Sequence, residues 1–200
     1  MKILSWLAVS AVALSTTAHA QEDFTPEELI QAMQDGGLVI FIRHATTETD
    51  FADQVSADPS DCSTQRDLSE AGWHEAVQIG ESFRYFDIPV GHVISSQYCR
   101  AWQTAWLAFG SYEQNPGLNF AAGETYTDDQ IAQMRDGMLS AMATPVSGGG
   151  NLVLVGHDDP FEAATGVYPE PMGVTYVLRS DGSGGFEMLG HITPDRWPGR

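Results

Sequence analysis

The stretch LVIFIRH at residues 38–44 decides the fold, because five consecutive apolar residues run directly into an arginine and a histidine. An unbroken apolar run of this length, preceded by Gly36-Gly37, is typical of a strand that is buried on both faces. The same pattern recurs at 152–157, where LVLV is followed by a glycine and a histidine. Strands of this kind belong to sheets that helices cover on each side, which indicates an α/β fold.

Alternating helices and strands are expected around these two runs. Thr25 opens a capping box and Pro26 takes the first helical position, which predicts a helix over 26–34. Further helices are expected at about 70–85, 98–109, 128–142 and 160–165, and further strands at 92–95, 174–178 and 186–192. The order predicts a three-layer α/β/α sandwich with a mostly parallel central sheet, to which the last two strands add an antiparallel edge. Residues 45–67 and 111–123 show no periodicity and are expected to be loops; a long loop in a compact domain is usually functional.

The first twenty residues have the pattern of a secretory signal peptide. Lys2 supplies the positive charge, and Ala18-His19-Ala20 is a small-residue cleavage site. The apolar run between them is too short for a helix that spans a membrane. We therefore expect 1–20 to be removed and 21–200 to form one domain, exported to the periplasm or the medium.

The charge of the chain excludes several classes of protein. Nine lysines and arginines stand against 27 acidic residues, a formal net charge of −18. Such a chain repels nucleic acids and anionic membrane surfaces, and it favours a monomer. Because Lys2 is the only lysine, the mature chain would carry arginines alone, and the position of each arginine becomes informative.

The two cysteines, Cys62 and Cys99, favour a disulfide, because an even count in an exported protein is usually paired. Two free thiols or a metal site are the alternatives. No histidine lies near either cysteine in the sequence, which makes a zinc site the poorer interpretation. A disulfide here would pin the loop 45–67 beside Arg100.

Polar residues follow three of the predicted strands at the point where each strand ends. These are Arg43-His44, Ser95-Ser96 with Arg100 just beyond, and Gly156-His157. Since ligands of open α/β sheets bind at the carboxyl ends of the strands, two histidines and two arginines are expected to meet there. Forked guanidinium groups match the oxygens of a phosphoryl group, which carries up to two negative charges.

Four blocks of sequence resemble the histidine phosphatase (phosphoglycerate mutase-like) superfamily. They are RHATT at 43–47, LSEAGWHEA at 68–76, SQYCRAWQTA at 96–105 and VLVGH at 153–157. The order is that of the family, and the similarity covers about 38–166. The chain looks most like the small exported bacterial members. Where the family usually has glycine, this chain has Ala45, a mild change.

The resemblance implies a role for each matching residue. His44 would be the nucleophile that forms a phosphohistidine, with its second ring nitrogen donating to a backbone carbonyl. Arg43 and Arg100 would bind the phosphate, together with His44 itself and His157, which would donate best when protonated. No metal or cofactor is implied, because the arginines supply the positive charge.

The proton donor to the leaving oxygen stays open between two acids. One branch of the family uses an aspartate directly after the second histidine, which is Asp158 here. The other branch uses a glutamate about two dozen residues after the second arginine, a spacing that Glu124 fits. Asp159, Glu162 and Glu48 are further candidates.

Three other residues carry expectations for the structure. Arg66 is expected to pair with an acid, and the alternative is a contact with substrate in the pocket. Trp102 and Trp106 lie at helical spacing and are expected in the core rather than on a substrate-binding surface.

These observations predict an exported, metal-independent phosphomonoesterase that acts on a phosphorylated small molecule or glycan. The alternative is a non-catalytic phosphate- or phosphoglycan-binding protein that retains the pocket. A metal-binding protein built on His44 and His157 has less support, because neighbouring arginines would repel a cation. A mutase is disfavoured, since an exported enzyme would lack a phosphorylated metabolite pool.

Overall fold

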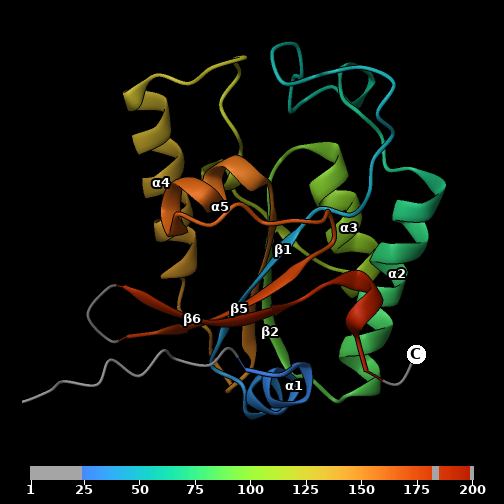
Figure 1. The fold of residues 1–200 in the computed structure, drawn as a ribbon, viewed down its shortest axis with the longest axis vertical. Helices are drawn as coiled ribbons and strands as arrows, with labels where there is room; N and C mark the ends of the chain where they lie inside the picture. The colour runs from blue at the N-terminus through green and yellow to red at the C-terminus, as the bar shows by residue number, and fades with distance from the viewer. Residues whose placement is uncertain (1–23, 182–184, 199–200) are drawn as a thin grey trace, which may run out of the picture.

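Helices cover both faces of a single central sheet in the computed structural model, which describes residues 24–181 and 185–198 (Figure 1). The expected signal peptide lies outside these residues. The helices are α1 (Pro26–Asp35), α2 (Glu70–Tyr85), α3 (Cys99–Phe109), α4 (Asp128–Met142) and α5 (Asp158–Thr165). The strands are β1 (Val39–Arg43), β2 (Val90–Ser95), β3 (Glu113–Gln114), β4 (Asn151–Gly156), β5 (Thr175–Ser180) and β6 (Phe186–Ile192).

The sheet has six strands in the order β3-β2-β4-β1-β5-β6 within the described residues. The first four are parallel to one another, while β5 is antiparallel to β1 and β6 to β5. This confirms the predicted three-layer α/β/α sandwich with an antiparallel edge. The short strand β3 lies in the segment that was expected to be loop, because two residues are too few to show a period.

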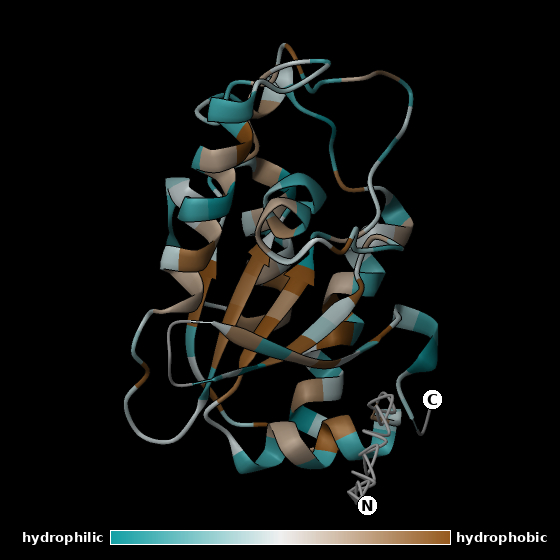
Figure 2. Ribbon diagram, turned by 60° about the vertical axis from the view of Figure 1, so that its left-hand side comes forward, coloured by the Kyte–Doolittle hydropathy of each residue, from teal (hydrophilic) through white to brown (hydrophobic). Residues whose placement is uncertain are grey.

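The core lies on both faces of the sheet, as the apolar runs predicted. Alternate residues of β1 face opposite layers: Ile40 and Ile42 contact the side of α1, α2 and α3, and Phe41 contacts the side of α4 and α5. The Phe41 ring stacks on Phe161 of α5 at a centroid distance of 4.1 Å. Figure 2 shows the central strands as hydrophobic along their length, with polar residues on the outer faces of the helices.

The tryptophans of α3 do not both enter this core. Trp102 is half-buried and stacks on Tyr112 at 6.1 Å, but Trp106 is 56% exposed, so its predicted burial is wrong. The small residues of the same helix, Ala101, Ala105 and Ala108, take the core-facing positions. Alanine lets α3 approach the sheet closely, and this leaves the indole of Trp106 on the opposite side.

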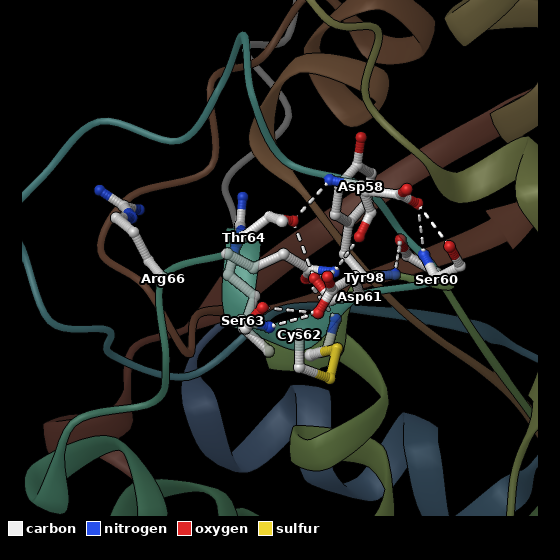
Figure 3. Close-up of a disulfide and its surroundings, with 12 residues drawn as sticks. Asp58, Ser60, Asp61, Cys62, Ser63, Thr64, Arg66 and Tyr98 are labelled. Atoms are coloured by element: carbon white, nitrogen blue, oxygen red, sulfur yellow. Dashed lines mark hydrogen bonds between the residues drawn. A yellow bond between two sulfur atoms is a disulfide. The ribbon is translucent and has the colours of Figure 1, made fainter.

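The loop 45–67 is tied to α3 by the expected disulfide, which the structure confirms (Figure 3). Cys62 lies in a single turn of 3₁₀ helix and Cys99 is the first residue of α3, with 5.7 Å between their Cα atoms. The Gln65 side chain adds a second tie, since its Oε1 accepts from the Cys99 N–H at 2.7 Å. The loop therefore folds back onto the helix that carries Arg100.

Asn151, the first residue of β4, joins three segments at the opposite end of the sheet. Its side chain is buried; Oδ1 accepts from the Leu38 N–H at 3.1 Å, and Nδ2 donates to the Met33 and Pro89 carbonyls at 2.7 and 2.8 Å. One amide thus satisfies backbone groups at the end of α1, before β1 and before β2.

Substitution Asn151→Ala is expected to lower the free energy of unfolding by about 2 kcal/mol, because it leaves the buried N–H of Leu38 without a partner and removes one of two donors from each of the Met33 and Pro89 carbonyls. Urea denaturation followed by circular dichroism measures the change. The control Gln133→Ala removes an exposed amide from α4 and should stay within about 0.5 kcal/mol of wild type. Equal effects of the two substitutions would contradict the structural role of Asn151.

Removing the disulfide by the double substitution Cys62→Ser and Cys99→Ala is expected to destabilise the protein. The bond closes a loop between residues 37 positions apart, which predicts a loss of up to about 4 kcal/mol from the chain entropy of the unfolded state. Urea denaturation with and without a reducing agent measures it. The reducing agent should lower the stability of wild type and leave that of the double variant unchanged. If the urea denaturation curve of wild type did not change in the reducing agent, the disulfide would not have this stabilising role.

Candidate active site

A cavity of about 250 Å³ opens at the carboxyl ends of the parallel strands. Three arginines and three aspartates line it, together with a histidine, two aromatic residues and two others. They are Arg43, Arg66, Arg100, Asp53, Asp158, Asp159, His44, Phe120, Tyr168, Ala52 and Gln54. Three arginines in one cavity are a large share of the few cations in this acidic chain, which makes the cavity the candidate site for an anion.

His44 follows the last residue of β1 and is fixed as one tautomer. Its Nδ1 lies 2.9 Å from the carbonyl oxygen of Ala45, which can only accept, so Nδ1 carries the proton. The Nε2 atom then holds the lone pair, and it accepts from Arg100 Nε at 3.2 Å. Burial, and next the charge of Arg100, hold the pKa of His44 well below its ordinary value. The imidazole is therefore neutral and able to act as a nucleophile.

Arg100 lies in the first turn of α3 and is buried with a compensating charge. Its Nη1 donates to Asp53 Oδ2 at 2.8 Å, and both side chains are about 95% buried. Asp53 Oδ2 also accepts from the backbone N–H of Arg66 at 2.8 Å. The Arg66 side chain reaches Asp53 at 3.7 Å, which confirms the expected pairing with an acid. Arg66 also lines the cavity, and a contact with substrate stays a prediction.

Arg43, the last residue of β1, is oriented by two acceptors. Its Nη2 donates to Asp158 Oδ2 and its Nη1 to the Pro169 carbonyl, at 2.6 and 2.9 Å. The guanidinium also lies over the ring of Tyr168, 5.4 Å from the centroid. The Tyr168 hydroxyl donates to the same Asp158 oxygen at 2.6 Å. The Nε of Arg43 is buried and has no hydrogen-bonding partner among the described residues.

His157 follows β4 and lies beside His44, with 5.3 Å between the ring centroids. The ring is buried among Tyr98 and Phe120, and its Nε2 is 2.9 Å from Ser96 Oγ. Burial and the charge of Arg100 lower the pKa of His157 far below its ordinary value. The protonated form, in which His157 would donate best, is therefore disfavoured in the ligand-free site. Its Nδ1 is buried and lacks a partner in the described part of the chain.

The backbone after His44 is fixed by side chains from two helices. The N–H of Ala45 donates to Thr104 Oγ1 at 3.0 Å, and the N–H of Thr46 donates to Glu75 Oε2 at 3.1 Å. A side chain at Gly72 would overlap the Thr46 carbonyl, so only glycine lets α2 approach this turn. The methyl group of Ala45 is buried beside Leu68 and Ala76, away from the cavity. Alanine in place of the family's usual glycine therefore adds no side-chain atom to the lining of the cavity.

The structure separates the candidate proton donors. Asp158 and Asp159 both line the cavity, at the start of α5. Glu124, Glu162 and Glu48 are exposed and none of them lines it. The spacing that favoured Glu124 thus does not bring its carboxyl group to the arginines in this structure.

Asp53, Tyr126 and Tyr168 contribute to the site but were not found from the sequence. Asp53 is one of six acidic residues in the loop 45–67, and no spacing distinguishes it from the others. The signal available was the loop itself, whose length and lack of periodicity indicated a functional segment. Tyr126 and Tyr168 reach Asp159 and Asp158 from segments with no recognisable motif.

The described residues hold neither a candidate metal site nor a helix that could span a membrane. They contain no group of three or more histidine, cysteine, aspartate and glutamate side chains placed to hold a metal ion. Among these same residues, no helix has both the length and the apolar character needed to cross a membrane.

Comparison with known proteins finds similarity in structure rather than in sequence. No protein-family model matches the chain, and no curated protein matches it. Among solved structures, the protein histidine phosphatase SixA bound to tungstate aligns with a TM-score of 0.58 at 15% identity, over 79% of this chain and 97% of that one. The ecdysone phosphate phosphatase of Bombyx mori, also with tungstate, aligns with a TM-score of 0.56 at 15% identity, over 78% and 92%.

A third similar structure is a mycobacterial glucosyl-3-phosphoglycerate phosphatase with inorganic phosphate. Its TM-score is 0.56 at 15% identity, and the alignment covers 78% of this chain and 98% of that one. The three proteins have different substrates in their names but share one architecture, with nearly their whole length aligned to this chain. The chain has the phosphoglycerate mutase-like fold of the histidine phosphatases.

Proposed function

We propose that the protein is an exported, metal-independent phosphomonoesterase that acts through a phosphohistidine at His44. One observation carries the proposal: the unprotonated Nε2 of the buried His44 accepts a hydrogen bond from Arg100, in a cavity that Arg43 also lines. The fold is shared with structures of phosphatases that hold tungstate or phosphate, which supports the same class of ligand here.

The chemistry proceeds from the residues that line the cavity. The phosphoryl group binds to the guanidinium groups of Arg43 and Arg100, whose positive charge stabilises the equatorial oxygens. When the phosphate accepts the hydrogen bonds of Arg100, Arg100 Nε no longer donates to His44 Nε2. The lone pair on Nε2 can then attack phosphorus. The carbonyl of Ala45 holds the proton on Nδ1 and stabilises the positive charge that develops on the ring. Water then hydrolyses the phosphohistidine.

His157 and Asp158 have supporting roles in this proposal. Asp158 orients Arg43 through the 2.6 Å ion pair. His157 lies next to His44 and holds an unpartnered ring nitrogen, which supports a hydrogen bond to the bound phosphoryl group. Such a bond would raise the pKa of His157, because it brings a negative charge next to the ring.

The substrate we propose is a phosphorylated small molecule or glycan, and the protein is proposed to act as a monomer outside the cytoplasm. The disulfide supports an oxidising compartment, in agreement with the signal-like sequence at 1–20. The strong negative charge of the chain supports a monomer in solution.

Substitution His44→Ala is expected to lower kcat/KM for p-nitrophenyl phosphate by at least about 10³-fold, because it removes the nucleophile. The assay contains a metal chelator, which should not reduce the wild-type rate. The matched control is His74→Ala, which removes an exposed histidine from α2. After rapid quenching at alkaline pH, mass spectrometry of the wild-type protein should find one phosphoryl group on His44.

The outcomes of this assay separate the proposal from its alternatives. Loss of wild-type turnover in the chelator would overturn metal independence. Tight binding of phosphate or vanadate without turnover by wild type would favour the phosphate-binding protein. Turnover that persists in His44→Ala would show that another group is the nucleophile.

Substitution Arg100→Lys is expected to weaken vanadate binding about 10- to 100-fold, because a lysine cannot donate to Asp53 and to the ligand in the geometry of a guanidinium. Isothermal titration calorimetry measures the affinity. Arg135→Lys is the control, since Arg135 is half-exposed on α4 and pairs only with Asp136 in the described structure. Equal vanadate affinities for the two variants would show that Arg100 does not bind the phosphoryl group.

A further inference from the structure

The reaction proposed above needs a proton for the departing oxygen, and the inference drawn here rests on that proposed function. An alkoxide is a poor leaving group, so a phosphomonoesterase that acts on sugars or other alcohols gains from a general acid. Three carboxyl groups line the cavity, those of Asp53, Asp158 and Asp159. Their hydrogen-bonding partners differ, and this difference distinguishes Asp159 from the other two.

Two of these groups form close ion pairs with arginines. Asp53 accepts from Arg100 Nη1 and from the Arg66 N–H on the same oxygen, each at 2.8 Å. Asp158 accepts from Arg43 Nη2 and from a tyrosine hydroxyl, each at 2.6 Å. To carry a proton, either group would have to give up the charge that pairs with its arginine.

Asp159 is held by neutral donors instead. Its Oδ2 accepts from the Tyr126 hydroxyl at 2.7 Å and from Gln54 Nε2 at 3.2 Å. Gln54 Nε2 also donates to the Tyr126 oxygen at 2.6 Å, so the three side chains form a closed triangle. Both of these hydrogen bonds fall on Oδ2, which leaves Oδ1 as the oxygen that can carry a proton in the cavity that Asp159 lines. No arginine forms an ion pair with Asp159 in the described structure.

The groups that face Asp159 mostly oppose its ionisation. Burial raises its pKa most, and the charges of Asp158 and Glu162 on α5 raise it further. The hydrogen bond from Tyr126, in the loop before α4, and the charge of Arg43 on β1 lower it. Burial and the bond to Asp159 also raise the pKa of Tyr126, so the tyrosine remains a donor.

We propose that Asp159, and not Asp158, is the general acid that protonates the leaving oxygen, oriented by Tyr126 and Gln54. As His44 Nε2 forms its bond to phosphorus, the bond from phosphorus to the ester oxygen breaks, and its electron pair stays on that oxygen. The proton on Asp159 Oδ1 moves to this oxygen and releases a neutral alcohol. The Asp159 carboxylate then takes a proton from water, whose oxygen attacks phosphorus. The bond between phosphorus and Nε2 breaks, and its electron pair returns to the ring.

The test compares two esters of nearly the same shape, p-nitrophenyl phosphate and p-nitrobenzyl phosphate. The nitrophenolate leaves without a proton, whereas the benzyl alkoxide needs one. Asp159→Asn is expected to lower kcat/KM for the benzyl ester by about 10²- to 10⁴-fold, and for the phenyl ester by less than about tenfold. The ratio kcat/KM reports the steps up to the phosphohistidine, so slow hydrolysis of that intermediate does not obscure the result. Activity on the phenyl ester also shows that the variant is folded.

Two control variants separate a proton donor from a positioning residue. At a pH low enough to keep Asp159 protonated in every variant, Asp158→Asn should lower kcat/KM for both esters by a similar factor, since Asp158 acts through Arg43 on the phosphoryl group they share. Glu124→Gln removes an exposed acid that does not line the cavity and should leave the ratio of the two esters unchanged. The proposal would be overturned if Asp159→Asn lowered kcat/KM equally for the two esters. It would also be overturned if the loss of kcat/KM depended on the leaving group in Asp158→Asn and not in Asp159→Asn.

The pH dependence gives a second readout. A general acid must be protonated, so the rate for the benzyl ester relative to the phenyl ester should fall as pH rises through the pKa of Asp159. The ratio cancels the ionisation of the phosphate, which the two esters share. Asp159→Asn should make the ratio independent of pH, and a falling ratio in this variant would contradict the proposal. If wild type hydrolyses neither ester, the proposed function fails, and the role of Asp159 fails with it.

Discussion

The parallel pairing of β1 with β4 is the interaction on which the rest of the site depends. The ladder pairs Arg43 with Gly156, so the residues that follow, His44 and His157, leave the sheet side by side. A shift of one residue would turn the alternate side chains of β1 to the opposite layer, which the buried apolar residues on both faces forbid. The packing of the core therefore fixes the distance between the two histidines.

Burial of positive charge is the second constraint, and the loops satisfy it. An arginine in a low-dielectric site requires a partner. Arg43 pairs with Asp158, while Arg66 and Arg100 share Asp53. Asp53 comes from the loop 45–67, which the disulfide holds against α3. Three arginines thus share two aspartates, and the ion pairs offset only part of the positive charge of the cavity. A phosphate that binds here would accept hydrogen bonds from guanidinium groups that already pair with these aspartates.

The partly different surroundings of Asp158 and Asp159 follow from the start of α5. Two consecutive residues in the first turn of a helix point in different directions. Asp158 contacts Arg43 at the end of β1. Asp159 contacts Tyr126 in the loop before α4. Adjacent acids of the same type thereby acquire an ion pair in one case and a neutral, buried environment in the other.

The sequence by itself determined the α/β sandwich, the disulfide and the residues at the strand ends, because each depends on a local pattern. The apolar runs defined β1 and β4, and the polar residues after them marked the edge where Arg43, His44 and Arg100 meet. Only the tertiary structure decided the rest. The exposure of Trp106 depends on which face of α3 packs closest to the sheet, and the separation of Asp158 from Asp159 depends on partners distant in the chain. Asp53 and Tyr126 come from loops without periodicity, so their places follow from contacts over long sequence separations, which no local pattern encodes.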